Sequence, residues 1–328
     1  MKAIVFDRPG GSSVLHLADV EDPVAMAGEV TVRVAAAGVN RADVFQRMGF
    51  YPPPPGASPI LGLEVSGEID GVGAGVTRWR RGDRVMALLD GGGYAQRARV
   101  AQGQVMHVPN TLDAVASAAI PEVFIAAHDS LTKRASLQPG ETVLIHGGAG
   151  GVGTAAIQVA TSLGATVIVT TGSGEKMRRC ADLGAAHAIS YRTEDFVART
   201  RGFTAGHGVD VILDVMGAEY FERNVNTLAS DGRLVIISHQ GGTIVELNIA
   251  MLAQLRGTVF APRLRSRPAA QKARIVADFT DSVLPLLADG RMRPVVHRVF
   301  PLAEAAAAHD ALDSDETIGK IVLDVASA

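Results

Sequence analysis

Cysteine is nearly absent from this sequence, since Cys180 is the only one in 328 residues. A single cysteine excludes a disulfide within the chain and a zinc site built on several cysteines. A chain without disulfides suits a reducing compartment, so we expect a cytoplasmic protein. The 9 histidines are scattered, with no close pair at ligand spacing, and no metal site is expected.

Long hydrophobic runs and a strong net charge are missing as well. Residues 1–7 read as a short strand without the apolar stretch of a signal peptide, and no run of about 18 uncharged apolar residues predicts a membrane span. The formal net charge is −3, with 31 basic and 34 acidic residues. A general attraction to nucleic acid or to anionic lipid is therefore not expected.

The length and the pattern of the chain predict an α/β protein of two domains. Short alternating strands at 29–34, 65–69 and 83–88, separated by turns rich in glycine and proline, predict a partly open β-barrel. Farther along, apolar strands alternate with helices, which predicts a doubly wound parallel sheet of the Rossmann type. The tail is too short for a further domain, and we expect it to complete the barrel. The expected domains are 1–121 with 263–328, and 122–262.

The central stretch contains six apolar runs and four amphipathic segments. The expected strands are 142–146, 166–171, 188–191, 209–215, 233–238 and 258–261. The expected helices are 154–163, 175–183, 194–201 and 220–229. In the tail we expect a long helix at 271–288, a strand at 295–301, a helix at 303–312 and a strand at 320–325.

The strongest local signal is a glycine-rich turn between the first strand and the first helix of the central stretch. Gly148, Gly150, Gly151, Val152 and Gly153 belong to a G-x-G-x-x-G pattern. Glycines permit a tight turn and let bare backbone approach a pyrophosphate, while the helix N-terminus offers free N–H groups. Because the pattern lies between a predicted strand and a predicted helix, it predicts a dinucleotide site.

The end of the second strand indicates which nicotinamide cofactor is bound. An NAD-preferring site usually has an acid there for the ribose 2′-hydroxyl, but this sequence has Thr171 and Gly172. Ser173 could donate to a 2′-phosphate and Lys176 could pair with it, although Lys176 could also be a solvated surface lysine. Tyr191, after the third strand, could flank the adenosine or could be a boundary aromatic. We therefore expect NADPH.

Residues at the ends of later strands should lie along the same cofactor. Ligands of open α/β sheets bind beyond the carboxyl ends of the strands, which places Val215, Ser238 and Phe260 there. His146, at the end of one expected strand, and His239, directly after another, invite a role as proton donor. His146 is more typical of a core histidine with satisfied hydrogen bonds, whereas for His239 both interpretations stay open.

Five separate blocks of the sequence resemble one family. They are GVNRAD at 38–43, GFYPPPPG at 49–56, GLEVSG at 62–67, AIPE at 119–122 and IGKIVL at 318–323. In this order and spacing they resemble the zeta-crystallin-like quinone oxidoreductases, which are zinc-free medium-chain dehydrogenases. The tumour-suppressor-inducible subfamily is the most similar, and the resemblance runs over essentially the whole chain.

The resemblance implies a GroES-like barrel domain, a Rossmann domain, a cleft between them and a homodimer. It also implies that Asn40 faces the nicotinamide, because Asn40 and Leu63 stand where zinc-dependent relatives carry metal ligands. Tyr51 matches a tyrosine of the quinone pocket, and Lys320 lies beside the cleft, where we expect it to bind the cofactor. From the residues alone, Asn40 could instead cap a turn and Tyr51 could be a packed loop aromatic. Gly150 departs from the family, whose members often have serine there.

Hydride transfer without a metal favours an acceptor that takes hydride easily. We therefore expect an NADPH-dependent quinone oxidoreductase, in which Asn40 and Tyr51 position the acceptor. An NADPH-dependent enoyl or alkenal reductase on the same fold is the alternative. A protein of another class, an NADPH-binding sensor or RNA-binding protein with little turnover, also stays open.

Overall fold

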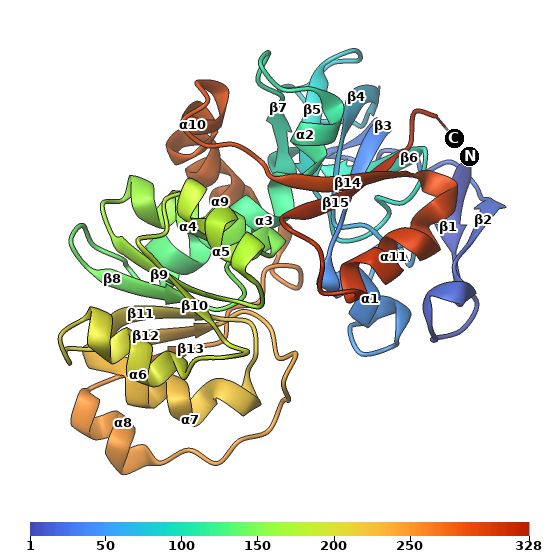
Figure 1. Ribbon diagram of the computed structural model, residues 1–328. Coiled ribbons are helices and arrows are strands. Elements are labelled where there is room, and N and C mark those ends of the chain that lie inside the picture. The colour runs from blue at the N-terminus through green and yellow to red at the C-terminus, as the bar shows by residue number, and fades with distance from the viewer. Residues whose placement is uncertain (328) are drawn as a thin grey trace. The chain divides into compact units, whose positions relative to one another are not determined.

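The computed structural model describes residues 1–327 of the chain, which form two compact units (Figure 1). One unit, here the terminal unit, contains Met1–Ile125 and the chain from Leu264 onward, and the other, the central unit, contains Ala126–Arg263. The sequence placed these divisions after residues 121 and 262. In the structure the first division falls after Ile125 instead of residue 121, within helix α3 (Pro121–His128).

The central unit is built on a six-stranded sheet in the order β10-β9-β8-β11-β12-β13. All neighbouring strands of this sheet pair in parallel, as a doubly wound fold requires. The strands are β8 (Thr142–Ile145), β9 (Thr166–Thr171), β10 (His187–Ser190), β11 (Val209–Asp214), β12 (Leu228–Ile236) and β13 (Thr258–Phe260). The middle strands β8, β9 and β11 are almost entirely buried on both faces, and the predicted parallel sheet is confirmed.

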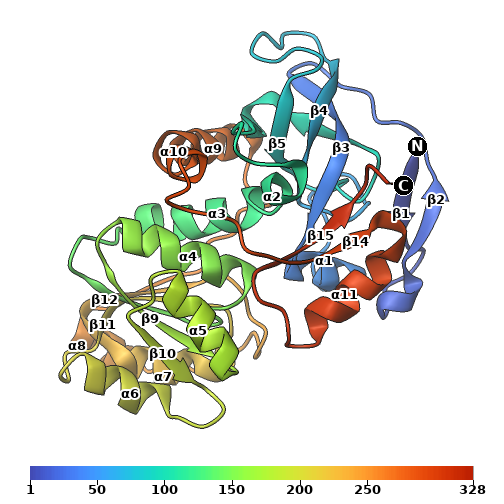
Figure 2. The same cartoon turned by 45° about the horizontal axis from the view of Figure 1, so that its top comes forward.

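Helices cover both faces of the central sheet. Figures 1 and 2 show α4 and α5 on one face and α6 and α7 on the other. The helices after the first division are η3 (Asp129–Arg134), α4 (Gly151–Ser162), α5 (Gly174–Asp182), α6 (Phe196–Phe203), α7 (Ala218–Thr227) and α8 (Ile249–Leu255). Helix α4 begins at Gly151, three residues before its predicted start, because the glycine turn itself enters the helix.

The terminal unit has a larger sheet in the order β14-β15-β3-β4-β5-β7, with β6 paired to β3 and a separate β1–β2 pair. Its strands are β1 (Lys2–Val5), β2 (His16–Asp19), β3 (Glu29–Val39), β4 (Glu64–Val72), β5 (Arg84–Leu88), β6 (Arg97–Ala101), β7 (Val105–His107), β14 (Val296–Pro301) and β15 (Lys320–Asp324). The tail returns as predicted, because β15 pairs antiparallel with β3. Val30, Val32 and Val34 alternate into the core of this unit.

Helices complete the terminal unit. They are η1 (Ser12–Val14), α1 (Arg41–Arg47), η2 (Gln102–Gln104), α2 (Ala114–Ala118), α9 (Ala269–Ser282), α10 (Leu284–Ala288), η4 (Leu302–Glu304) and α11 (Ala305–Asp313). The single helix expected at 271–288 is wrong, since the structure divides it at Val283 into α9 and α10. Pro285 explains the division, because it has no N–H to continue the hydrogen-bond ladder of α9. Within residues 1–327, no helix is long and apolar enough to cross a membrane.

Candidate active site

The glycine turn after β8 leaves no room for a side chain at Gly148 or Gly153. Gly147 has a φ of +67°, in the left-handed region. A Cβ added to Gly153 would lie 2.3 Å from the carbonyl oxygen of Gly147 and 2.6 Å from that of Gly148. A Cβ on Gly148 would lie 2.6 Å from Val169 Cβ of the neighbouring strand. Glycine is thus required by the turn itself and by its packing against the sheet.

The first turn of α4 offers its backbone N–H groups to a ligand. In residues 1–327, the N–H groups of Gly151, Val152 and Gly153 have no hydrogen-bond acceptor, as is usual for the first positions of a helix. The positive end of the helix dipole lies at the same place. A pyrophosphate is the kind of ligand that such a helix start binds, so the turn fits a dinucleotide cofactor.

A second group of residues gathers where β9 and β10 end. Ser173 caps α5, with its Oγ accepting the N–H of Lys176 at 3.3 Å. Lys176 is only 8% exposed, so it is not a freely solvated surface lysine. Tyr191 lies against Gly172, where an added Cβ would meet the Tyr191 hydroxyl at 2.5 Å and Arg192 Nε at 3.3 Å. Arg192 is a cation that the sequence reasoning missed, although it directly follows Tyr191.

The predicted residues at the other strand ends lie on the same edge of the central sheet. Val215 follows β11, Ser238 follows β12 and Phe260 ends β13, and all these strands are parallel. Val215 approaches the glycine turn, since its Cγ2 would lie 3.3 Å from a Cβ on Gly147. The Asp214 carboxylate shapes the turn after β11 by accepting the N–H of Gly217 at 2.7 Å. The sheet edge therefore brings the predicted cofactor residues of the central unit together.

His146 does not face this edge. It is 1% exposed, and its ring nitrogens contact Thr170 Oγ1 at 3.0 Å and Asn224 Oδ1 at 2.7 Å. Burial lowers the pKa of His146 to about 4, with Asn224 opposing the shift. The histidine is therefore neutral and part of the core, as its position at the end of a buried strand predicted.

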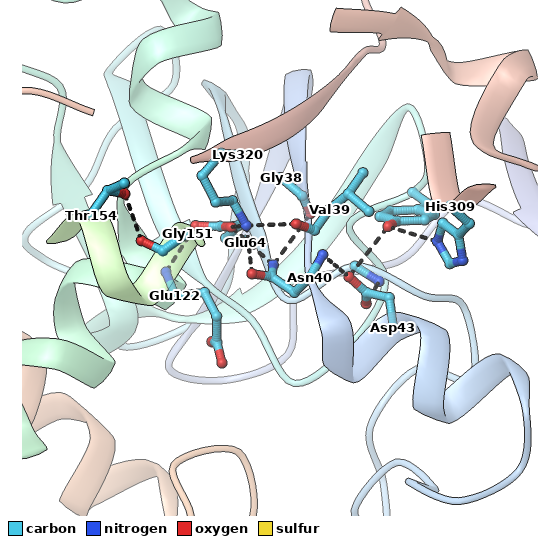
Figure 3. A network of polar contacts seen from close by, with 12 residues as sticks. Gly38, Val39, Asn40, Asp43, Glu64, Glu122, Gly151, Thr154, His309 and Lys320 are labelled. Atoms are coloured by element: carbon cyan, nitrogen blue, oxygen red, sulfur yellow. Dashed lines mark hydrogen bonds and ion pairs between the residues drawn. The ribbon is translucent and has the colours of Figure 1, made fainter. Parts of the chain in front are cut away.

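In the terminal unit, a buried ammonium group holds three oxygen atoms together (Figure 3). Lys320 Nζ of β15 donates to Glu64 Oε1 at 2.7 Å, to the Val39 carbonyl at 2.7 Å and to Asn40 Oδ1. The Lys320 side chain is 3% exposed and that of Glu64 is 0% exposed. A buried ion pair needs additional hydrogen bonds to offset its lost hydration, and the Asn40 amide and the Val39 carbonyl provide them.

Asn40 is fixed on both sides of its amide. Its Oδ1 accepts from Lys320, and its Nδ2 donates to Glu64 Oε1 at 2.9 Å. Asn40 also caps α1, where its backbone N–H donates to Asp43 Oδ2 at 2.8 Å. Asn40 therefore occupies the N-cap position of α1, and its side chain is held within a buried polar cluster. Its contact with the nicotinamide or the acceptor stays a prediction.

A chain of hydrogen bonds leads away from Asp43 to the surface helix α11. Tyr94 donates its hydroxyl to Asp43 Oδ2 at 3.2 Å and contacts His309 Nε2 at 3.1 Å. Arg47 Nη1 contacts His309 Nδ1 at 3.1 Å. Because a guanidinium only donates, Nδ1 must accept, and His309 is neutral with its proton on Nε2. Burial lowers the pKa of His309 to about 3, and the Arg47 and Arg41 charges add to the shift.

Glu122 is an acid that the sequence reasoning did not single out, although it lies in the AIPE block. Its backbone N–H donates to Glu64 Oε2 at 2.8 Å. Figure 3 shows its carboxyl group pointing away from Glu64, Lys320 and Asn40. Burial raises the pKa of Glu122 to about 8, and the negative charge of Glu64 adds to the shift. A pKa near 8 keeps this carboxyl group mostly protonated at neutral pH.

Arg265 is a third residue that the sequence reasoning missed, after Arg192 and Glu122. Its guanidinium lies over the ring of Tyr51, 5.4 Å from the ring centroid. Its Nη2 donates to Gln46 Oε1 at 2.7 Å and its Nε to the Asp90 carbonyl at 2.8 Å. Its Nη1 is buried and has no hydrogen-bond partner in residues 1–327. The predicted acceptor residue Tyr51 is thus accompanied by a cation with an unused N–H donor.

The glycine turn and the sheet edge of the central unit fit a dinucleotide cofactor. Comparisons with known proteins support an NAD(P)H-dependent oxidoreductase. The family description "Alcohol dehydrogenase GroES-like domain" matches residues 26–110, and "Zinc-binding dehydrogenase" matches residues 183–323. The quinone oxidoreductase of Pseudomonas aeruginosa is 34% identical over 324 residues, which cover 98% of this chain and 99% of that protein. The chain belongs to the quinone oxidoreductase-like family of medium-chain dehydrogenases/reductases.

Two further relatives extend the comparison. The 2-haloacrylate reductase of a Burkholderia species is 32% identical, with 98% of each chain covered. The crystal structure of Escherichia coli quinone oxidoreductase complexed with NADPH superposes with a TM-score of 0.90 at 30% identity, covering 99% of this chain and all of that one. The predicted fold, a GroES-like domain with a Rossmann domain, is thereby confirmed.

Zinc does not fit the residues of this chain, despite the name of the matching family. In the described part of the chain, 1–327, no group of three or more histidine, cysteine or acidic side chains could hold a metal ion. Glu64 and Asn40, which could contribute oxygen ligands, are already bound to the Lys320 ammonium group. The Lys320 ammonium group therefore supplies the positive charge beside Glu64 and Asn40.

Proposed function

We propose that this protein is an NADPH-dependent quinone oxidoreductase that acts without a metal. The observation that carries the proposal is Arg265, a buried cation with an unpaired N–H donor beside Tyr51. Such a donor suits a carbonyl oxygen that gains negative charge during reduction. The quinone oxidoreductases of P. aeruginosa and E. coli, which match nearly the whole chain, support the same acceptor class.

The choice of NADPH over NADH rests on the end of β9. Ser173, Lys176 and Arg192 can bind a 2′-phosphate there, and Tyr191 can flank the adenosine. Thr171 and Gly172 leave no acid to bind a ribose 2′-hydroxyl. We expect NADPH to bind at least tenfold more tightly than NADH in fluorescence titrations. Tighter binding of NADH would refute this part of the proposal.

The roles of the remaining predicted residues follow from their contacts. The bound cofactor would supply the hydride, its pyrophosphate held by the backbone from Gly148 to Gly153, with Val215, Ser238 and Phe260 along it. Tyr51 would stack on the flat acceptor. Asn40, held by Glu64 and Lys320, would present a fixed amide to the acceptor or the nicotinamide. We therefore assign Lys320 to the support of Asn40 rather than to direct contact with the cofactor.

Steady-state oxidation of NADPH tests the acceptor. We expect turnover with 1,4-naphthoquinone and orthoquinones that exceeds turnover with simple ketones or aldehydes. Loss of NADPH absorbance in the presence of each acceptor is the measurement. Binding of NADPH without turnover on any quinone or enone would instead favour an NADPH-binding sensor or an RNA-binding protein.

A second candidate is an NADPH-dependent enoyl or alkenal reductase. It is supported by the similarity to 2-haloacrylate reductase and by the protonated Glu122, because reduction of a conjugated alkene needs a proton at carbon. A panel of enones and 2-alkenals, assayed beside the quinones, separates the two functions. Higher kcat/KM on the enones would replace the quinone assignment.

Two wider properties belong to the same proposal. We propose a homodimer in the cytoplasm, as the family resemblance and the single cysteine imply. Light scattering after size-exclusion chromatography measures the oligomeric state. A monomer at micromolar concentration would contradict the dimer.

A further inference from the structure

The acids of the terminal unit's polar cluster differ in how fully they are bonded. Asp43 accepts the N–H groups of Asn40 and Gly62 and the hydroxyl of Tyr94. Glu64 accepts from Lys320, from Asn40 and from the backbone N–H of Glu122. The Glu122 carboxyl group, in contrast, makes no hydrogen bond or ion pair with any residue from 1 to 327. It is therefore the one acid of this cluster whose protonated oxygen is available to a substrate.

The position of Glu122 is nevertheless fixed. It lies in the first turn of α3, and the bond from its backbone N–H to Glu64 joins it to the carboxylate that also holds Asn40. Glu64 thus links Glu122 to the Asn40 amide, which we propose faces the acceptor. Its side chain is only partly exposed, so water does not fully surround it.

We propose that Glu122 is the proton donor of the reaction, an inference that rests on the proposed function. Reduction of a quinone by two electrons needs one hydride and one proton. The O–H bond of Glu122 breaks as an O–H bond forms on the acceptor, the hydride completes the hydroquinone, and NADPH becomes NADP⁺. The carboxylate left on Glu122 takes its next proton from water. With an enone as acceptor, the proton goes to the carbon next to the carbonyl.

The charged groups around Glu122 favour this role. Glu64 and Asp43 disfavour a second negative charge, whereas Lys320 and Arg265 oppose that effect. The Lys320 ammonium group is already bonded to three oxygens and has no N–H left for Glu122. Since burial and Glu64 dominate, the pKa of Glu122 rises to about 8, near the value that suits a proton donor at neutral pH.

Replacement of Glu122 by glutamine tests the donor, because Glu122→Gln keeps the shape and removes the acidic proton. We expect kcat with 1,4-naphthoquinone to fall roughly 100-fold, while the Kd for NADPH is unchanged. The wild-type kcat should decline above about pH 8, and this decline should vanish in Glu122→Gln. Glu122→Asp should retain part of the rate. The control is Glu304→Gln, an exposed acid of the same unit, which should match the wild type.

The outcomes separate the two proposals. Turnover by the wild type with an equal kcat and an equal pH profile in Glu122→Gln overturns Glu122 as the donor and leaves the proposed function standing. A wild type that binds NADPH but reduces neither quinones nor enones overturns the proposed function, and the donor with it. Thermal unfolding of Glu122→Gln is measured at the same pH values. It distinguishes a fall in kcat caused by unfolding from a fall caused by loss of the proton donor.

Discussion

The central unit and the terminal unit differ in which part of the polypeptide supplies the polar groups of their candidate sites. In the central unit, the donors are backbone N–H groups at the start of α4, and the glycine turn keeps side chains away from them. In the terminal unit, side chains such as those of Lys320, Glu64 and Asn40 provide most donors and acceptors. They are bonded below the surface to one another and to nearby backbone groups.

This difference determines which substitutions each unit tolerates. A backbone site fails when a side chain is added, even a methyl group, because the added atoms occupy the ligand's place or push the turn aside. A side-chain network fails when one member is removed, because its partners are left buried and unbonded. The two kinds of site can therefore be told apart by opposite substitutions.

Removal of the Lys320 charge should have the largest effect on the terminal unit. Lys320→Met leaves the fully buried Glu64 carboxylate without its cation, and we expect the free energy of unfolding to fall by about 3–5 kcal/mol. Urea unfolding followed by circular dichroism measures it. The double variant Lys320→Met with Glu64→Gln removes both charges and should recover at least half of the loss. A loss below about 1 kcal/mol in the single variant would show that the ion pair is not critical.

Addition of one methyl group should have the next largest effect, on the central unit. Gly153→Ala places a Cβ 2.3 Å from the Gly147 carbonyl oxygen, so the turn must shift. We expect NADPH affinity to fall about 100-fold, or about 2.7 kcal/mol, in fluorescence titration. Gly202→Ala is the matched control, because nothing lies within 4 Å of its added Cβ and α6 should gain a few tenths of a kcal/mol. Equal NADPH affinity in Gly153→Ala and wild type would remove the turn from the cofactor site.

The contrast between the units also explains how much the sequence predicted. In the central unit, the glycine turn, β9 and the residues at the strand ends follow from local pattern, since parallel strands place their carboxyl ends on one edge. Local sequence alone therefore placed Gly153, Ser173, Lys176 and Val215 near the carboxyl ends of these parallel strands, where the structure also has them.

The terminal unit could not be predicted to the same depth. Its bonds join residues that are far apart in the chain, such as Asn40 with Lys320 and Tyr94 with His309. The matching blocks indicated Asn40 and Lys320, but no periodicity shows that one ammonium group would bind both Asn40 and Glu64. Arg265 was missed because its significance is an unpaired N–H, which only three-dimensional packing reveals.

The His309 chain should make the terminal unit sensitive to acid. The pKa of His309 is lowered in the folded protein to about 3, so the unfolded chain binds a proton first as pH falls below about 6.5. Its contribution to stability is therefore complete above pH 6.5 and is lost progressively toward pH 3. Between pH 7 and pH 5 we expect the wild type to lose about 2 kcal/mol more than His309→Gln. Asp43 is present in both proteins, so the difference in urea unfolding isolates His309, and parallel pH profiles would contradict the assignment.

The smallest predicted effect tests whether Arg265 Nη1, the one buried side-chain N or O atom of the described terminal unit without a hydrogen-bond partner, serves a ligand. Arg265→Met removes the Nη1 donor, and we expect kcat/KM for 1,4-naphthoquinone to fall about tenfold, the value of one charged hydrogen bond of about 1.5 kcal/mol. Most of the change should appear in the KM for the quinone, with the Kd for NADPH unchanged. Arg97→Met is the matched control, because the Arg97 guanidinium already pairs with Asp22 and Asp70 and has no role in acceptor binding. Partial rescue of Arg265→Ala by added guanidinium ion would identify Arg265 as a ligand-binding donor. Equal losses of kcat/KM in the Arg265 and Arg97 variants would instead leave Arg265 as a structural residue that is bonded to Gln46 and Asp90.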